Sequence, residues 1–217
     1  MAKKYNTVFF DLDGTIIDSG EGVSNSVLYA LEKFGIKETK ENALKFIGPP
    51  LAHSFKQFYG FSDEKATQGI EIYREYYREK GIFECYIYQG IEELLCALKK
   101  NGYKVVLCTS KPEKYAQQIL NHFGIMKYFD HACGATMDEK TRATKDDVMK
   151  YAFKVSGAKP DSTIMIGDRM FDINSANKFG LDSIGVTFGY GSQEELKTAG
   201  ATYIAGSCNE IKELLIG

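Results

Sequence analysis

Two aspartates stand at the end of an apolar segment close to the start of the chain. Val8, Phe9 and Phe10 predict a buried strand, and Asp11 and Asp13 follow it directly. Buried carboxylates are costly unless a cation or hydrogen bonds compensate them. One carboxylate as nucleophile beside another as general acid and base would suit phosphoryl transfer. An acid-rich turn after a strand, without any chemistry, is the alternative interpretation.

A second group of residues has the types that bind a phosphate oxyanion. An apolar strand is expected over Lys104–Cys108; Thr109 and Ser110 follow it, and Pro112 favours the start of a helix. Hydroxyls and free backbone N–H groups at such a point bind oxyanions, and Gly14, after the acid pair, permits a similarly close backbone approach. Taken alone, Thr109 and Ser110 are more simply explained as an ordinary helix cap.

A lysine marks the start of a third segment, a predicted helix over residues 145–156. A cation at a helix N-terminus opposes the helix dipole, so Lys145 is unfavourable there unless an anion lies nearby. Lys140 and Arg142 are close enough in the sequence to serve instead. Without further context, a solvated lysine is the simplest interpretation.

A fourth segment repeats the pattern of an apolar strand followed by a glycine and an acid. The strand expected over Thr163–Ile166 leads into Gly167 and Asp168, and Asp172 comes one helical turn later. Carboxylate oxygens, water and phosphate are the ligands that Mg²⁺ prefers, so Asp168 is a candidate metal ligand. Asp172 would orient the metal's waters or hold Lys145. Both acids also suit the first turn of a helix.

The elements that must position these segments divide the chain into two regions with different sequence patterns. Residues 20–82 read as helices, whereas strands alternate with amphipathic helices from residue 83 onward. Such alternation predicts an α/β fold with a doubly wound parallel sheet and right-handed crossovers, into which the helical block is inserted. Because ligands bind at the carboxyl edge of such sheets, the four segments are expected to meet there. We expect a core of residues 1–17 plus 83–217, with residues 18–82 as a separate helical module.

Composition excludes several classes of protein. A formal net charge of −2 over 217 residues gives no electrostatic basis for binding nucleic acid or an anionic membrane. The five cysteines are odd in number and form no CxxC pair, which favours a reducing compartment over a disulfide framework or zinc site. The N-terminus does not read as a signal peptide, and no stretch is apolar enough to span a membrane. We expect a cytoplasmic protein without a nucleic-acid or membrane partner, either a monomer or a weak dimer.

Taken together, the four segments resemble the motifs of the haloacid dehalogenase-like hydrolase superfamily over essentially the whole chain. The run from Asp11 to Thr15 is similar to the first motif, Thr109 to the second, Lys145 to the third, and the run from Gly167 to Asp172 to the fourth. The resemblance implies a Rossmann-like core with an inserted all-helical cap. It further implies a phosphatase of small phosphorylated metabolites that uses Mg²⁺.

The resemblance also implies a role for each motif residue. Asp11 would be the nucleophile that forms an aspartyl-phosphate, and Asp13 the general acid and base. Mg²⁺ would be held by Asp11, the Asp13 carbonyl and Asp168. Thr109, Ser110, Lys145 and Gly14 would bind the phosphate, and Asp172 would support the metal site.

The branch of the superfamily is suggested by the turn Gly48-Pro49-Pro50-Leu51, which together with Gly167-Asp168-Arg169 most resembles the phosphoglycolate phosphatases. A 5′-nucleotidase or a pyrophosphatase is the alternative. A β-phosphoglucomutase is less expected, because this turn has no arginine, and a non-catalytic binder of phosphorylated ligands has no need of Asp13. Four residues of the cap region are candidates for substrate contact: Asp18, Gly48, Pro49 and His53.

Overall fold

The computed structural model describes residues 4–138 and 140–217, which form two compact units. One unit comprises Met1–Ile17 with Ile87–Gly217, and the other Asp18–Tyr86. The first unit contains the parallel sheet, so the residues expected to do chemistry are described there. The second unit is helical, and each unit is described by itself.

The first unit alternates strands and helices, as the sequence predicts. Its elements are β1 (Thr7–Phe10), α5 (Ile91–Lys100), β4 (Lys104–Pro112), α6 (Glu113–His122), β5 (His131–Ala135), α7 (Lys145–Ser156), β6 (Thr163–Gly167), α8 (Met170–Phe179), β7 (Asp182–Val186), α9 (Gln193–Thr198), β8 (Tyr203–Ala205) and α10 (Cys208–Ile216), with one-turn 3₁₀ helices at Met126–Tyr128 and Pro160–Ser162. The chain passes between the units through two short strands, β2 (Ile17–Asp18) and β3 (Tyr86–Ile87), which pair with each other.

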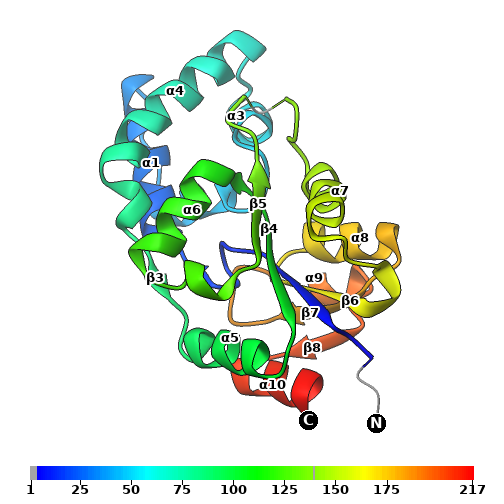
Figure 1. Cartoon of the computed structure of the whole chain (residues 1–217). Coiled ribbons are helices and arrows are strands. Elements are labelled where there is room, and N and C mark those ends of the chain that lie inside the picture. The colour runs from blue at the N-terminus through cyan, green and yellow to red at the C-terminus, as the bar shows by residue number, and fades with distance from the viewer. Residues whose placement is uncertain (1–3, 139) are drawn as a thin grey trace. The chain divides into compact units, whose positions relative to one another are not determined.

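The six-stranded sheet has the order β5-β4-β1-β6-β7-β8, and the strand pairs in it are parallel. The α/β doubly wound fold predicted from the sequence is therefore confirmed (Figure 1). The first strand of the chain, β1, lies between β4 and β6. This order places the acid pair after β1 between the polar ends of its two neighbours, at the edge where such sheets bind ligands.

Side chains from alternate positions of the strands fill the two faces of the sheet. Phe9, Val106 and Met165 occupy paired positions on β1, β4 and β6, and they share one buried cluster. The same cluster includes Val148 and Ala152 of α7, so α7 covers this face together with α8 (Figure 1). The neighbouring strand residues are also fully buried and, by the two-residue alternation, must point to the opposite face, where α5 packs on β4.

The strand β4 is longer than expected and ends irregularly. It was expected to end at Cys108 and to lead into a helix from Pro112, but it pairs with β5 as far as Pro112, with a register shift after Thr109. The reason is Gly134 on β5: a Cβ atom there would lie 2.6 Å from the carbonyl oxygen of Lys111, so only glycine admits this backbone. A bulge of this kind redirects side chains at the end of a strand.

The second unit consists of helices built around an apolar interior. Its elements are α1 (Gly20–Lys33), α2 (Lys40–Ala43), α3 (Leu51–Tyr59) and α4 (Asp63–Glu79), with 3₁₀ turns at Leu44–Phe46 and Gly81–Phe83. The ring of Phe55 stacks on Phe61 with their centroids 5.5 Å apart, and it meets Phe46 edge-on at 5.0 Å. These three rings are buried, so they serve helix packing.

The second unit extends four residues beyond the expected boundary at residue 82. Residues 83–86 belong to it because Glu84 is bonded to its helices. The Gly22 N–H donates to the Glu84 carbonyl at 3.0 Å, and the Glu84 carboxylate accepts from Asn25 and from the Tyr76 hydroxyl, each at 2.9 Å. The contacts of Glu84 with Gly22 and Asn25 connect positions about 60 residues apart, which the local sequence pattern does not reveal.

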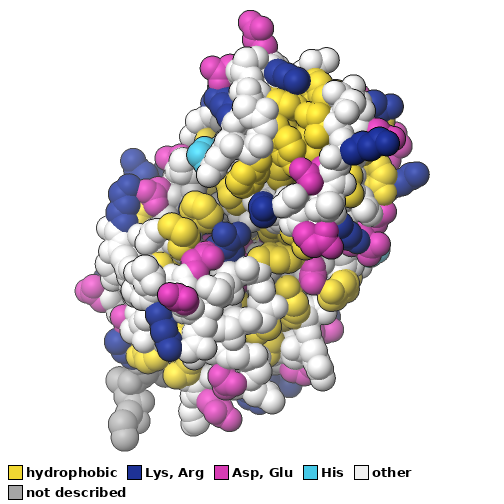
Figure 2. Space-filling view, turned by 180° about the vertical axis from the view of Figure 1, so that it is seen from behind, with side chains coloured by type: hydrophobic (Ala, Val, Ile, Leu, Met, Phe, Trp, Pro, Cys, Tyr) yellow, Lys and Arg dark blue, Asp and Glu magenta, His cyan; other side chains and the backbone are white. Residues whose placement is uncertain are grey.

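The surface has no strong segregation of charge on the face that Figure 2 presents, where acidic and basic side chains are interspersed. Among residues 4–138 and 140–217, no helix combines the length and hydrophobicity that crossing a bilayer would require. Within the same residues, no disulfide joins any of the five cysteines.

Candidate active site

The register of the sheet brings the polar residues of three strands, β1, β4 and β6, together. Phe10 pairs with Leu107 on one side and Ile166 on the other. The next residue, Asp11, is therefore level with Cys108 and Gly167, and its N–H continues the ladder by donating to the Ile166 carbonyl at 2.9 Å. Thr109 and Asp168 come one residue further along their strands. The convergence expected from the sequence is thus a direct result of parallel pairing.

At this edge, Lys145 lies between two carboxylates. Its Nζ atom is 2.5 Å from Oδ1 of Asp11 and 2.7 Å from Oδ1 of Asp172, and it donates to the Cys108 carbonyl at 2.7 Å. Burial opposes the charge on this ammonium, but the two aspartates outweigh it and raise the pKa of Lys145 above its ordinary value. The lysine therefore stays charged and can hold an anionic oxygen beside Asp11.

The position of Lys145 is set by the cap of the helix that it begins. The Thr144 hydroxyl accepts from the Asp147 N–H at 3.2 Å, and the Asp147 carboxylate accepts from the Thr144 N–H at the same distance. This reciprocal capping box fixes the first residue of α7. A lysine there is unfavourable for the helix dipole, and the nearby carboxylates Asp11 and Asp172 compensate it.

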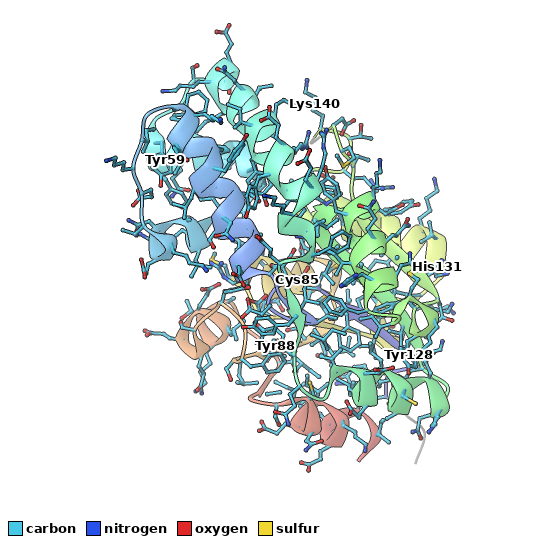
Figure 3. The ribbon with its side chains drawn as sticks, turned by 90° about the vertical axis from the view of Figure 1, so that its left-hand side faces the viewer. Tyr59, Cys85, Tyr88, Tyr128, His131 and Lys140 are labelled. Carbon is cyan, nitrogen blue, oxygen red and sulfur yellow. The ribbon has the colours of Figure 1, made fainter. Side chains whose placement is uncertain are left out.

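Arg142, which the sequence offered as a substitute for Lys145, has other partners. Its guanidinium binds the Glu113 carboxylate at 3.0 Å and the Gly134 carbonyl at 3.1 Å, and it stacks 3.9 Å from the Tyr151 ring centroid. Lys140 has an exposed side chain (Figure 3). Lys145 is thus the one of the three that the structure brings to Asp11.

Asp168 is fully buried, and only one of its two carboxylate oxygens has a hydrogen-bond partner among the described residues. Its Oδ2 atom accepts from the Tyr190 N–H at 2.8 Å, whereas Oδ1 has no hydrogen-bond partner within the described part of the chain. Burial raises the pKa of Asp168 well above its usual range, and the carboxylates of Asp172 and Asp11 raise it further. An ionised Asp168 therefore requires a positive group that the described side chains do not supply at Oδ1.

A divalent cation fits this arrangement. Oxygen atoms of Asp11, Asp168 and Asp172 all lie within 4.8 Å of one another, and all three residues are buried. Among the described residues, Lys145 is the ammonium group bound within this cluster, so three carboxylates share one cation. Two negative charges remain, which a divalent ion with oxygen ligands would balance. Both oxygens of Asp172 are engaged, one by Lys145 and the other by the Arg169 N–H at 3.2 Å. The second oxygen of Asp11 and Oδ1 of Asp168 are therefore the available carboxylate ligands.

Asp13 has a partner that the sequence analysis did not identify. The Nζ atom of Lys111 lies 2.9 Å from Oδ2 of Asp13, and the two side chains are only 7% and 15% exposed. Lys111 stands two residues after Thr109, within the run that was considered for phosphate binding, and the irregular end of β4 brings it to the acid pair. The only signal in the sequence was a lysine at the end of an apolar strand.

Thr109, Ser110 and Gly14, which were expected to bind phosphate together with Lys145, differ in burial and in hydrogen-bond partners. Thr109 is buried, and its hydroxyl accepts from the Lys111 N–H at 3.2 Å, while Ser110 is half-buried. The Gly14 N–H donates to the Ile17 carbonyl at 2.8 Å, so it is already used within the turn. The structure instead requires Gly14 because its φ is +80° and because a Cβ atom would overlap the Asp168 carboxylate.

The candidate cap residues all belong to the second unit. Both carboxylate oxygens of Asp18 are engaged there, one by the Gly20 N–H and the other by the Tyr86 hydroxyl, each at 2.8 Å. Asp18 thereby links the two short strands through which the chain passes. Gly48 and Pro49 are half-buried and His53 is exposed; their expected role stays a prediction.

The profile of the haloacid dehalogenase-like hydrolases matches residues 8–186, which include all four of the segments singled out in the sequence. The chain belongs to this family. The matched residues include Asp11, Asp13, Lys145 and Asp168.

Similar proteins cover almost the whole of this hydrolase. A 5′-nucleotidase of Pseudomonas aeruginosa is 37% identical over 215 residues, which are 99% of this chain and 97% of the nucleotidase. The tyrosine-protein kinase PtkA of Mycobacterium tuberculosis is 34% identical over 211 residues, 96% of this chain and 72% of the kinase. A predicted phosphatase of Clostridium acetobutylicum, whose crystal structure is known, has a TM-score of 0.94 and 49% identity, with 98% of each chain covered.

The similarity to these relatives shows that this haloacid dehalogenase-like hydrolase is a phosphatase, as the resemblance of its motifs predicted. The activities named for the relatives differ from one another, although all of them act on phosphoryl groups by name. The likeness therefore extends to the class of chemistry and leaves the substrate to be proposed.

Replacing Lys111 with methionine should lower kcat for phosphate release from 4-nitrophenyl phosphate by about 10- to 100-fold, because a small displacement of a catalytic group has effects of that order. The ion pair with Asp13 is removed while most of the side-chain volume is kept. Lys111→Arg, which retains the charge, should recover a substantial part of the rate. Wild-type kcat in Lys111→Met, with an unchanged circular dichroism spectrum, would show that this ion pair has no part in turnover.

Proposed function

We propose that this protein is a Mg²⁺-dependent phosphatase of small phosphomonoesters that works through an aspartyl-phosphate on Asp11. The observation that carries the proposal is the buried contact of Asp11 with Lys145, at the sheet edge where Asp13 and Asp168 also lie. A carboxylate nucleophile, an adjacent acid and a charged lysine are the groups that a two-step phosphoryl transfer needs.

In the first step, an Asp11 oxygen attacks the phosphorus atom of the substrate. An Asp11–phosphorus bond forms as the bond from phosphorus to the leaving oxygen breaks, and Asp13 donates a proton to that oxygen. Lys111 holds the Asp13 carboxylate in place. Lys145 and the Thr109 hydroxyl bind the transferring oxygens, whose charge is spread over the phosphoryl group in the transition state.

In the second step, Asp13 takes a proton from a water molecule that attacks the same phosphorus atom. The Asp11–phosphorus bond breaks, inorganic phosphate leaves, and the Asp11 carboxylate is restored. Asp13 thus gives one proton and takes one back, so that the protein returns to its starting state after each turnover. Before the attack Lys145 is charged, because Asp11 and Asp172 raise its pKa, and Asp172 still pairs with it when Asp11 is phosphorylated.

The ion would be held by Asp11, by the open oxygen of Asp168 and by the main-chain carbonyl of Asp13. When bound, Mg²⁺ screens the repulsion between the Asp11 carboxylate and the anionic phosphate. Asp172 keeps Lys145 in place, and the buried surroundings of Asp168 limit competition from water.

For the substrate, a nucleoside 5′-monophosphate is the first candidate, because the relative that matches this chain over 97% of its own length has the name 5′-nucleotidase. Phosphoglycolate is the second candidate, on the resemblance of the turn Gly48-Pro49-Pro50-Leu51. We propose that the helical unit is the cap that selects the substrate, with His53, Gly48 and Pro49 as its contact residues. A cytoplasmic location agrees with cysteines that form no disulfide in the described residues.

The proposal is tested by measuring phosphate release from a panel of substrates in the presence of Mg²⁺. The panel contains the nucleoside 5′-monophosphates, phosphoglycolate, pyrophosphate, β-glucose 1-phosphate and a phosphotyrosine peptide. We expect kcat/KM for one class of phosphomonoester to exceed the others by at least tenfold, and addition of EDTA to abolish the release. Absence of turnover on every compound, with Mg²⁺ present, would contradict the phosphatase and favour a binder of phosphorylated ligands.

A further inference from the structure

The loop Phe188–Gly191, between β7 and α9, packs directly against Asp168. A Cβ atom on Gly189 would lie 2.5 Å from Oδ2 of Asp168 and would overlap the Gly14 carbonyl oxygen. A Cβ atom on Gly191 would overlap the main-chain carbonyl oxygen of Asp168. The loop backbone therefore approaches this aspartate more closely than any residue with a side chain permits.

Gly189 is required because the loop lies so close to Asp168. The backbone geometry of Gly189 itself does not demand a glycine. It does not have the positive φ that Gly14 and ten other glycines of the chain adopt. An alanine at position 189 would thus keep a backbone that it can adopt without strain, and its methyl group would displace the Asp168 carboxylate. The close contact is the feature that the glycine serves.

The same loop makes the one hydrogen bond that fixes the orientation of the Asp168 carboxylate. The Tyr190 N–H donates to Oδ2 at 2.8 Å, and Oδ1 of this fully buried side chain is left without a partner among the described residues. Oδ1 belongs to the side chain that shares the three-carboxylate cluster with Asp11 and Asp172. One oxygen is therefore held by the loop, and the other is available to a ligand.

The loop is anchored at both of its ends. The Phe188 ring meets the Tyr88 ring edge-on, with their centroids 5.1 Å apart (Figure 3 labels Tyr88). Beyond the loop, the Glu195 carboxylate accepts from the Arg169 Nε at 2.9 Å and from the Met170 N–H at 2.8 Å. These contacts tie the segment after β7 to the residues that directly follow Asp168, so the loop cannot move away without disturbing them.

We propose that the loop Phe188–Gly191 is a positioning element for the metal ligand Asp168, with Gly189 and the Tyr190 N–H as its essential parts. The loop fixes the carboxylate so that Oδ1 faces the cation. This inference rests on the proposed function for the presence of a divalent ion at Asp168. Removing a group that orients a metal ligand lowers the metal affinity by about 10- to 100-fold.

The test is direct metal binding without substrate, with Mn²⁺ as the paramagnetic probe and Mg²⁺ as the competitor. In Gly189→Ala we expect the dissociation constant for both ions to rise at least about tenfold. The matched control is Gly206→Ala, in the loop after β8. There a Cβ atom would have only an ordinary contact, at 3.5 Å from the Glu210 carboxylate, and metal affinity should equal that of the wild type.

A second variant keeps the inference testable if Gly189→Ala fails to fold. Glu195→Ala releases the far end of the loop from Arg169 and Met170, and it should weaken metal binding in the same direction and to a smaller extent. Its control is Glu194→Ala, an exposed residue of the same helix, which should change nothing. Recovery of phosphate release in Gly189→Ala at high Mg²⁺ would support a positioning role.

Unchanged metal affinity in the folded variants Gly189→Ala and Glu195→Ala would overturn the inference and leave the proposed function intact. A wild-type protein that binds neither Mn²⁺ nor Mg²⁺ would also overturn it, since Asp168 would then have no cation to be positioned for. The failure of the phosphatase proposal is recognised separately, by the absence of phosphate release from the substrate panel.

Discussion

Asp11→Asn is expected to abolish phosphate release, with a loss of at least about 10³-fold in kcat, because the carboxamide cannot form the acyl-phosphate bond that the two-step route requires. The substitution keeps the size of a side chain that is buried against Lys145. Phosphate release should be measured on the best substrate of the panel, together with rapid acid quenching of radiolabelled substrate to trap a phosphorylated protein.

The wild type should accumulate label that is stable to acid and is cleaved by hydroxylamine, and Asp11→Asn should accumulate none. Asp13→Asn is the matched control, with the same chemical change two residues away. With 4-nitrophenyl phosphate, whose leaving group needs little protonation, this control should still form the labelled protein but release phosphate slowly. Full turnover in Asp11→Asn would show that water attacks the substrate directly and that Asp11 is not the nucleophile.

Asp168→Asn is expected to raise the stability of the metal-free protein and at the same time to remove its response to Mg²⁺. The wild-type carboxylate is fully buried, has one unpartnered oxygen within the described residues, and lies near two other carboxylates. Removing a poorly compensated buried charge should stabilise the apo protein by about 1–3 kcal/mol. For a chain of this size, that corresponds to a rise of roughly 2–10 °C in Tm.

Thermal unfolding in EDTA and in Mg²⁺ measures both effects. The wild type should gain stability on addition of Mg²⁺, since a ligand that binds only the folded state stabilises it, whereas Asp168→Asn should not. Asp172→Asn is the informative comparison, because Asp172 is just as buried but is paired with Lys145 at 2.7 Å. Breaking that pair should lower Tm. A lower Tm for Asp168→Asn in EDTA would contradict the account of Asp168 as an uncompensated charge.

Much of the fold could be predicted from local patterns. Strand β6 and helix α7 lie within a residue of their expected bounds, because the strand is continuously apolar and the helix has a clear apolar period with a defined cap. The end of β4 could not be predicted in the same way. Its extension to Pro112 depends on Gly134 of the neighbouring strand, more than 20 residues away in the sequence.

The charged residues of the site could likewise be predicted only in part: the acids could be selected from the sequence, but their ion-pair partners could not. Asp11, Asp13 and Asp168 could be selected from the sequence, because acids after apolar strands are costly and the parallel topology brings strand ends together. The sequence favoured Lys145 as the phosphate-binding cation and left Lys140 and Arg142 as substitutes. Only the structure shows that Arg142 is bound to Glu113, which leaves Lys145 at Asp11.

Residue types, short spacings and strand order were therefore enough to predict the class of fold, the family and the three acids Asp11, Asp13 and Asp168 at the sheet edge. The tertiary structure alone decided three further features: the ion pair of Lys111 with Asp13, the use of the Gly14 N–H within its own turn, and the loop Phe188–Gly191 around Asp168. Each depends on contacts of a few ångströms between side chains and backbone, two of them between segments far apart in the sequence. Such contacts are set by packing across the sheet edge, which local periodicity does not encode.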